Sequence, residues 1–397
     1  MEFISRLADT TTKTKIVDQL LTGVSGEFDL AVLFVNPMQP YDAKSVYQQV
    51  ESRIKIKNFL CVTCAGVIGS QREIEYQPAA SLLLARLPDV DIKPFYLDQS
   101  QLDEFQKSED VYKFFEIYPH EKPVFLVMPD PFLFDPAQFL DLINHAYPKC
   151  GIVGGLASAG HQARENAIIL NNKIYDEGLI GYVLTGNVAV ETVVSQGCRP
   201  VGTTYIVTKA KENVIYELAG RPFYEVLKEV LKHANEYDRK LAQEAIFVGV
   251  AMNEYKHQFK RGDFLIRGVM DIDPNSGAGA IADYIQTGQT IQFHLRDARA
   301  AQDDLIELLQ ANKERWSHRH PAGAFVFSCN GRGYNLFGVQ DHDIRMIQNT
   351  IGPLSAAGFF CAGEIGPVGG LNFLHGFTNS IALFYEPDDQ DLTNDKK

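Results

Sequence analysis

The segment Cys361-Ala-Gly-Glu-Ile-Gly366, near the end of the chain, repeats Cys64-Ala-Gly-Val-Ile-Gly69 near its beginning with one difference in six positions. Each copy follows a short apolar run typical of a buried strand, Phe59–Thr63 in one case and Gly358–Cys361 in the other. Chance is the weaker explanation, because both copies end the same strand–helix–strand frame. We therefore predict an internal duplication with two related halves.

The strand–helix–strand frame is found three times along the chain. Its predicted elements are 31–35, 42–50 and 59–63, then 124–128, 136–146 and 151–155, then 324–328, 341–351 and 358–361. Such alternation favours parallel strands joined by right-handed crossovers. The predicted fold class is therefore α/β, with two related halves of strand–helix–strand units and mixed, partly parallel sheets.

The predicted boundary between the two halves falls near residue 215, and an amphipathic helix follows it. Gly220 and Pro222 precede apolar residues at helical spacing, namely Phe223, Val226, Leu227, Val230, Leu231 and Ala234. We predict domains at 28–215 and 220–386, followed by a flexible acidic tail at 387–397. Further along, Asp297 follows a predicted strand and is expected to cap a helix running from Ala298 toward Trp316.

Composition narrows the class of protein and of partner. The 397 residues carry a net charge of −13, which repels nucleic acid and anionic membrane surfaces. No uninterrupted apolar run is long enough to cross a bilayer. The six cysteines are scattered and follow no secretory leader, so free thiols in a cytoplasmic setting are expected.

The first candidate site is the turn Ser328-Cys-Asn-Gly-Arg-Gly333, which directly follows a predicted strand. Backbone amides at Gly331 and Gly333 can converge on an anion, with Cys329 and Asn330 beside them. The guanidinium of Arg332 has the planar fork that binds a carboxylate or phosphate. An ordinary tight turn with a solvated arginine is an equally weighted alternative.

The second candidate site is the turn Cys361-Ala-Gly363-Glu364, where open α/β sheets bind ligands at the carboxyl ends of their strands. A carboxylate at Glu364 can accept the amino group of a ligand. Together with Arg332 it would suit a zwitterion such as an amino acid. The alternative is that both side chains serve only each other or the backbone.

Three more arginines are candidate ligand contacts. Arg199 follows a predicted strand beside a glycine turn, Arg267 lies within a strand, and Arg296 lies where a strand meets a helix. An arginine in an apolar strand needs a partner. An internal carboxylate, such as Asp263 or Asp297, is the more common partner.

Several catalytic patterns fail on spacing. Cys61 and Cys64 point to opposite faces of a strand, and no second pair completes a zinc site, so no metal is expected. The segment Gly155–Gly160 is one residue too long for a nucleophile elbow. Phosphate-binding and dinucleotide-binding glycine loops are absent from the sequence. These failures favour a binding protein over an enzyme.

Longer motifs resemble the FIST family over residues 28 to 386. The segments that carry the resemblance are Gly154–Ser158, Val194–Gly202, Gly262–Arg267, Gln292–Asp297, Phe327–Gly333, Gly358–Gly370 and His375–Thr378. The resemblance implies a sensory module for signal transduction that binds a small molecule, with amino acids or small carboxylates as candidate ligands. It brings no catalytic residue and no cofactor. Because no kinase or cyclase domain fits in this chain, a separate signalling protein is the expected output.

Two alternatives remain open. Some FIST-like proteins bind haem and sense nitric oxide, and a haem would need an axial ligand such as His294 or His375 in an apolar pocket. A buried, hydrogen-bonded histidine is the more common case, and a Soret band would distinguish the two. A thiol-dependent enzyme using Cys329 or Cys361 ranks last, because no base is evident nearby.

Overall fold

The computed structural model describes residues 1–9, 13–37, 42–256 and 258–387, so most of the predicted acidic tail lies outside the described residues. The chain forms two compact units. One contains residues 1–194, 307–374 and 378–397, and the other contains residues 195–306 and 375–377. The sequence-based boundary near residue 215 falls inside the second unit, which is inserted between segments of the first.

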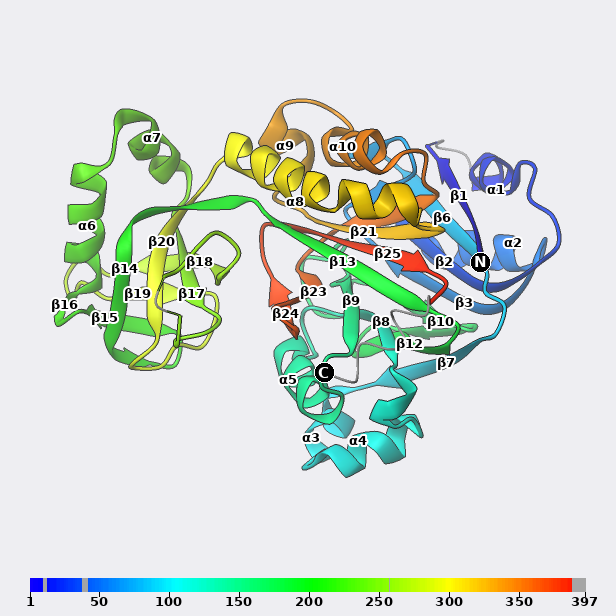
Figure 1. Cartoon of the computed structure of the whole chain (residues 1–397), viewed down its shortest axis with the longest axis horizontal. Helices are drawn as coiled ribbons and strands as arrows, with labels where there is room; N and C mark the ends of the chain where they lie inside the picture. The colour runs from blue at the N-terminus through cyan, green and yellow to red at the C-terminus, as the bar shows by residue number, and fades with distance from the viewer. Residues whose placement is uncertain (10–12, 38–41, 257, 388–397) are drawn as a thin grey trace. The chain divides into compact units, whose positions relative to one another are not determined.

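The first unit contains three six-stranded sheets (Figure 1). In order across the first sheet, the strands are β1 (Glu2–Ala8), β6 (Ala79–Arg86), β2 (Glu27–Asn36), β3 (Lys55–Thr63), β10 (Ile168–Leu170) and β11 (Lys173–Tyr175). In the second they are β7 (Val90–Leu97), β12 (Leu179–Gly186), β8 (Val124–Pro129), β9 (Gly151–Gly155), β23 (Glu364–Val368) and β24 (Leu371–His375). In the third they are β13 (Ala189–Gln196), β25 (Thr378–Tyr385), β21 (Gly323–Cys329), β22 (Ala356–Cys361), β4 (Gly66–Ile68) and β5 (Glu73–Glu75).

The three sheets are copies of one topology. Each is centred on a parallel pair, β2–β3, β8–β9 or β21–β22, with antiparallel neighbours on both sides. The two strands after each pair leave for another sheet: β4–β5 join the third, β10–β11 the first and β23–β24 the second. The sequence motif after Phe59–Thr63 and that after Gly358–Cys361 therefore occupy equivalent places, and the structure adds a third equivalent copy after β9.

Helices connect the strands of the repeats. They are α1 (Lys13–Leu21), α2 (Ala43–Glu51), α3 (Gln99–Glu104), α4 (Ser108–Phe115), the 3-10 turn η1 (Pro119–Glu121), α5 (Pro136–Ala146), α8 (Ala298–His318), α9 (Gly333–Phe337) and α10 (His342–Ile351). Of these, α8 leads from β20 (Thr290–Arg296) of the second unit to β21. The strand–helix–strand predictions are confirmed within a few residues at every position. Asp297 also caps α8 as expected, because its Oδ1 accepts hydrogen bonds from the amides of Arg299 and Ala300.

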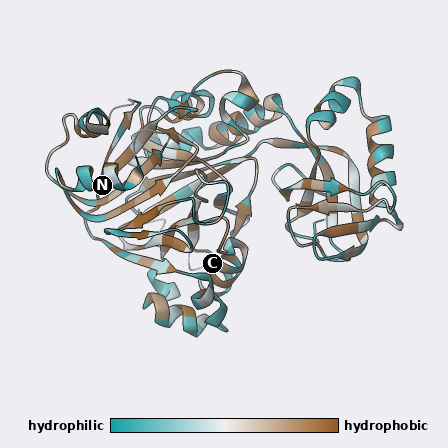
Figure 2. Cartoon of the chain, turned by 180° about the vertical axis from the view of Figure 1, so that it is seen from behind, coloured by the Kyte–Doolittle hydropathy of each residue, from teal (hydrophilic) through white to brown (hydrophobic). Residues whose placement is uncertain are grey.

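Alternation along the central strands separates two cores. In β2, Leu30, Val32 and Phe34 pack into a core shared by all three sheets, whereas Ala31 and Leu33 pack into one that includes α1 and α2. A strand buried on both faces needs a nearly continuous apolar run, which is what the sequence has there. Figure 2 shows these strands largely in brown, with hydrophilic residues frequent on the helices.

The second unit is a closed antiparallel barrel. Its strands, in order, are β14 (Cys198–Lys211), β20 (Thr290–Arg296), β17 (Phe247–Ala251), β18 (Phe264–Ile272), β19 (Gly279–Ile281), β15 (Val214–Leu218) and β16 (Arg221–Pro222), with helices α6 (Phe223–His233) and α7 (Glu236–Glu244). Pairing between β15 and β14 closes the ring. The apolar stripe predicted for 223–234 lies on α6 and packs into the barrel core.

Strand β9 offers a matched test of the parallel packing. A Cβ added at Gly154 would lie 1.9 Å from the backbone oxygen of Val127 in β8, whereas a Cβ at Gly151 would meet nothing within 4 Å. Gly154→Ala is therefore expected to lower the free energy of unfolding by about 2 kcal/mol or more, because backbone must move. Gly151→Ala should change it by less than about 0.5 kcal/mol. Equal effects in urea denaturation would contradict this packing.

Candidate functional site

The turns after β3, β9 and β22 meet at the carboxyl ends of the three parallel pairs. The amide of Leu156 donates to the oxygen of Gly363 (2.9 Å), and the amide of Ala362 donates to the oxygen of Leu156 (3.2 Å). The amide of Ser158 donates to the oxygen of Thr63 (3.3 Å). The turns converge because the sheets exchange strands. After each parallel pair, the chain crosses from its own sheet to a neighbouring sheet at the carboxyl ends of the strands.

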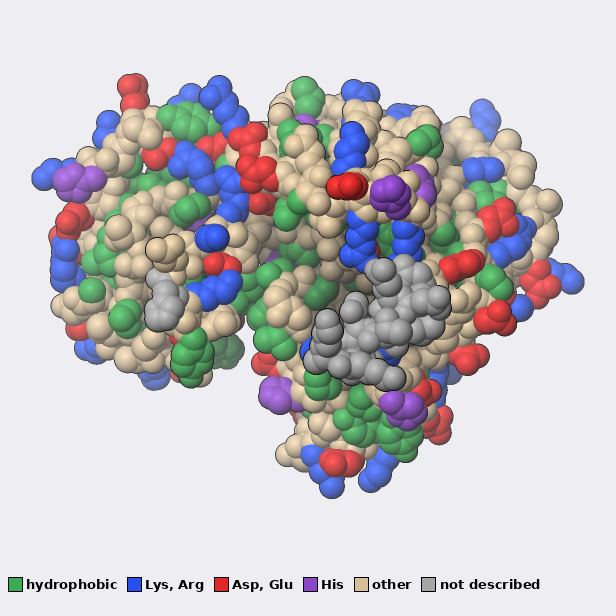
Figure 3. All heavy atoms as spheres, viewed as in Figure 1, with side chains coloured by type: hydrophobic (Ala, Val, Ile, Leu, Met, Phe, Trp, Pro, Cys, Tyr) green, Lys and Arg blue, Asp and Glu red, His purple; other side chains and the backbone are tan. Residues whose placement is uncertain are grey.

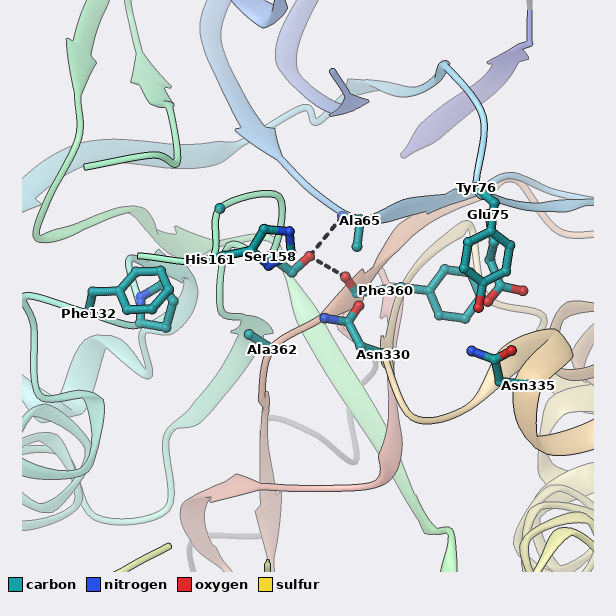
Figure 4. Close-up of a pocket in the computed structure, with 12 residues that line it drawn as sticks. Ala65, Glu75, Tyr76, Phe132, Ser158, His161, Asn330, Asn335, Phe360 and Ala362 are labelled. Atoms are coloured by element: carbon teal, nitrogen blue, oxygen red, sulfur yellow. Dashed lines mark hydrogen bonds between the residues drawn. The ribbon is translucent and has the colours of Figure 1, made fainter. Parts of the chain in front are cut away.

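Ser158 joins the three turns through its side chain. Its hydroxyl accepts a hydrogen bond from the amide of Ala65 (3.0 Å) and donates one to the oxygen of Phe360 (2.5 Å), as Figure 4 shows. The side chain is buried, and both of its hydrogen bonds go to backbone atoms of the other two repeats. Ser158 is therefore a structural residue at this junction rather than an activated nucleophile.

A pocket of about 390 Å³ opens at this junction. It is lined by Ala65, Glu75, Tyr76, Pro131, Phe132, Ser158, Gly160, His161, Asn330, Asn335, Phe360 and Ala362. The lining combines aromatic rings, amides and small residues, and it draws on the ends of all three parallel pairs. Open α/β sheets bind ligands at such strand ends, and small-molecule pockets have volumes of this order. We refer to it as the junction pocket.

Arg332, the predicted carboxylate ligand, does not line the junction pocket. Its guanidinium is fully buried and binds Asp343 of α10 through two hydrogen bonds, Nε to Oδ2 at 2.7 Å and Nη2 to Oδ1 at 3.0 Å. Burial alone would raise the pKa of Asp343, but the charge of Arg332 and the hydrogen bond from His342 hold it well below its usual value. The guanidinium is thus neither solvated nor paired with Glu364 or the backbone through these two bonds, as the alternatives from the sequence had it, but binds an internal carboxylate.

Glu364, the predicted ammonium ligand, is also fully buried and outside the pocket lining. Its Oε2 accepts hydrogen bonds from the amide (3.1 Å) and the hydroxyl (2.8 Å) of Thr378. These bonds join the start of β23 to the start of β25. Burial raises the pKa of Glu364 to about 8, although the bonds from Thr378 favour the charged form. Near neutral pH the side chain is therefore largely a neutral acid.

The remaining members of the two predicted turns have mixed positions. Asn330 lines the pocket, and its backbone amide donates a hydrogen bond to the backbone oxygen of Cys361 (2.9 Å). The amide of Gly331 donates to Cys329 Sγ (3.3 Å), so it does not project into an anion site. Gly333 has φ of +65° and packs against Glu75, leaving no room for a Cβ. The oxygen of Gly363 is engaged by Leu156. Of these residues, only Asn330 reaches the pocket.

The other three predicted arginines belong to the barrel unit and not to the unit with the junction pocket. Arg199 binds Asp297 (2.7 Å) and Asp238, and Arg267 binds Asp283. Internal carboxylates are thus their partners, although Asp283 rather than Asp263 is the partner of Arg267. Arg296 ends β20 of the barrel. None of the three lines a pocket described in that unit.

The two histidines of the haem alternative are buried in the second unit. Nδ1 of His294 lies 3.0 Å from the oxygen of Gln292, and its ring packs against Phe264 and the backbone of Gly249. Burial lowers the pKa of His294 to about 4. Neither His294 nor His375 lines the junction pocket or either of the barrel pockets described around Val214 and Tyr284. In the part of the chain that is described, the packing around His294 does not fit a haem.

The cysteines have the surroundings of core residues. All six are buried, and Cys61 and Cys64 pack into different cores, as their spacing on a strand requires. Burial raises the pKa of the Cys361 thiol well above its usual value, which works against a reactive thiolate. Among the described residues, no group of three or more cysteine, histidine or acidic side chains is placed to hold a metal ion.

Most of the pocket residues escaped the sequence analysis. Glu75, Tyr76, Phe132, His161 and Asn335 line the pocket but lie outside the sequence motifs that indicate a site. One signal was available, because Ala65 and Ala362 occupy the same place in the repeated Cys-Ala-Gly motif. The turn at Ser158 follows the strand–helix–strand unit at 124–155 in the same way as the two Cys-Ala-Gly turns follow theirs. This equivalence indicates that the three turns lie at corresponding strand ends.

Two further findings concern the chain as a whole. No helix among the described residues is long and apolar enough to span a bilayer. On the face shown in Figure 3, acidic and basic side chains are interspersed.

Comparison with known proteins identifies the family. The chain is 36% identical over 358 residues to the uncharacterized protein Rv0628c of Mycobacterium tuberculosis, a match that covers 90% of this chain and 91% of the relative. It is 35% identical over 360 residues to the uncharacterized protein Mb0898c of Mycobacterium bovis, covering 90% of each. The FIST N domain model matches residues 29–221, and the FIST C domain model matches residues 224–367. The chain therefore belongs to the FIST family of signal-transduction sensory domains.

Proposed function

We propose that this protein is a cytoplasmic sensor that binds a small molecule in the junction pocket and passes the signal to a separate protein. The observation that carries the proposal is the position of the pocket where the three repeats meet. A ligand there touches the turns after β3, β9 and β22 together. Binding would stabilise one arrangement of the three sheets, which is the physical requirement for a sensor.

The lining supports binding rather than catalysis. It offers two amides, a tyrosine, a carboxylate and a histidine among apolar rings, the mixture that gives a small ligand both affinity and orientation. The buried thiols of Cys329 and Cys361 do not line the pocket, so the thiol-enzyme alternative gains no support. The volume suits a molecule of about the size of an amino acid. An amino acid or a small carboxylate, the ligands expected from the sequence, would have to bind without Arg332.

The proposal predicts that filling the pocket abolishes ligand-induced stabilisation. A ligand at one hundred times its Kd stabilises the folded state by about 2.7 kcal/mol and so raises the melting temperature. Thermal-shift screening of amino acids, small carboxylates and amines should find such a ligand. Ala362 is exposed and lines the pocket, so Ala362→Phe should place a ring in the pocket and remove the ligand-induced shift of the melting temperature.

Ala311→Phe, at an exposed position on α8 away from the pocket lining, is the matched control and should keep the shift. A ligand that stabilises the Ala362→Phe protein as well as the parent binds elsewhere, which would refute the proposed site. No shift with any compound of a broad metabolite library would count against small-molecule sensing itself.

A further inference from the structure

Within the described part of the chain, Glu75 is the one acidic side chain that lines the junction pocket, and it is half-buried at the end of β5. Its Oε2 accepts a hydrogen bond from the amide of Tyr334 (2.9 Å). Gly333 packs so closely that a Cβ there would lie 2.6 Å from the carboxylate oxygens. The loop is thus shaped around this carboxylate. Among the described residues, no arginine or lysine forms an ion pair with it.

The charges around Glu75 favour a cation. Burial raises the pKa of Glu75 against the hydrogen bonds from the amide of Tyr334 and the side chain of Tyr76, and the negative charge of Asp343 adds to the rise. The guanidinium of Arg332 is directed to Asp343 rather than into the pocket. Among the residues that the structure describes, no arginine or lysine lines the pocket. A ligand carboxylate would therefore meet the Glu75 carboxylate and no arginine or lysine among the described lining residues, whereas an ammonium group would be attracted to Glu75.

Aromatic rings surround the same carboxylate. Figure 4 shows the rings of Tyr76 and Phe360 beside Glu75, with Phe132 at the opposite end of the pocket. Tyr76 has a φ of +58°, an uncommon conformation for a residue other than glycine, and the residue is 61% exposed. Strained residues cluster at ligand sites, and aromatic faces attract cations. The conformation of Tyr76 keeps its ring at the pocket.

We infer that the ligand is a small primary amine with an apolar body and without a carboxylate. Its ammonium group would bind Glu75 between Tyr76 and Phe360, its apolar part would extend toward Phe132, and Asn330 or Asn335 would bind any further polar group. The inference rests on the proposed small-molecule function and narrows it to one chemical class. It replaces the zwitterion expected from the sequence, because the described lining supplies a carboxylate for the amine but no arginine or lysine for the acid.

Matched compounds test the class directly. Isothermal titration of the full chain would compare phenethylamine, tyramine and cadaverine with phenylalanine, tyrosine and lysine, and with 3-phenylpropionate. At least one amine should bind ten or more times more tightly than the amino acid with the same side chain, and 3-phenylpropionate should not bind measurably. Amino acids or 3-phenylpropionate that bind as tightly as the amines, or a failure of every amine, would overturn the inference.

Variants at Glu75 and Tyr76 test whether these residues bind the ammonium group. Glu75→Gln retains an acceptor for the amide of Tyr334 but loses the charge, so it should weaken amine binding at least tenfold. Tyr76→Leu should also weaken it, by removing a ring at an exposed site. Glu314→Gln, on the exposed face of α8, should bind as the parent does. Unchanged amine binding by folded Glu75→Gln protein would overturn the inference.

The two proposals fail in different ways. If amino acids or carboxylates bind and Ala362→Phe blocks them, the sensor and its pocket stand while the amine class is wrong. If no compound of a broad library binds, the sensor proposal fails as well.

Discussion

Replacing Asp343 with alanine is expected to lower the free energy of unfolding by about 3–5 kcal/mol, because the change leaves the buried guanidinium of Arg332 without its counter-ion. Asp343 is 1% exposed and Arg332 is fully buried. The carboxylate also accepts hydrogen bonds from Asn379 Nδ2 (2.9 Å) and His342 Nδ1 (2.9 Å). One substitution thus removes the partner of several buried polar groups. Urea denaturation monitored by fluorescence measures the loss.

Lys57→Ala is the matched control. Lys57 pairs with Asp29 at 2.8 Å, but its side chain is 58% exposed and that of Asp29 is 26% exposed, so water can solvate the remaining carboxylate after the substitution. The expected loss is below about 1 kcal/mol. If Asp343→Ala lowered the free energy of unfolding as little as Lys57→Ala does, the Arg332 guanidinium would have to be solvated, contrary to its burial.

Replacing Glu364 with glutamine is expected to stabilise the protein increasingly as the pH rises from about 5 to 8. The pKa of Glu364 is about 8 in the folded state, against an ordinary value of 4.5 for the unfolded chain. Below pH 4.5, Glu364 is protonated in both the folded and the unfolded state, so it makes no net contribution to the pH dependence of the free energy of unfolding. Between the two values the unfolded chain releases the proton and the folded protein keeps it, so the stability of the parent falls as pH rises. Glutamine imitates the neutral acid and removes this dependence.

The size of the effect follows from the separation of the two pKa values. Each unit corresponds to about 1.4 kcal/mol, so the gain should reach a few kcal/mol by pH 8. Burial also raises the pKa of Glu73, which adds its own pH dependence to both proteins. The difference between Glu364→Gln and parent unfolding curves, measured at pH 5, 6.5 and 8, isolates Glu364. A variant that is less stable than the parent at pH 8 would show that the charged form is the native one.

The Glu364 variant also separates structure from sensing. Because Glu364 binds Thr378 and does not line the junction pocket, Glu364→Gln should bind any pocket ligand as the parent does. The sequence-based assignment of Glu364 to the ligand predicts the opposite, a folded protein without ligand-induced stabilisation. Thermal shifts on the two proteins decide between them.

The sequence by itself determined the local elements and the fold class. The strand–helix–strand predictions match β2–α2–β3, β8–α5–β9 and β21–α10–β22, because apolar runs and helical spacing report burial within one element. The repeated Cys-Ala-Gly motif likewise indicated related strands. Family-specific motifs were enough to expect FIST N and FIST C domains, since they are read residue by residue.

Only the tertiary structure decided what those elements do together. The strands that follow each parallel pair join another sheet, so Glu75 of the first repeat reaches Tyr334 of the third across 259 positions of sequence. The partner of Arg332 was equally hidden, because Asp343 reads in sequence as an acid in the first turn of a helix. Barrel closure also depends on which edges pair. Sequence patterns report which residues are buried, but the partners of buried charges and the lining of a pocket depend on contacts between distant segments.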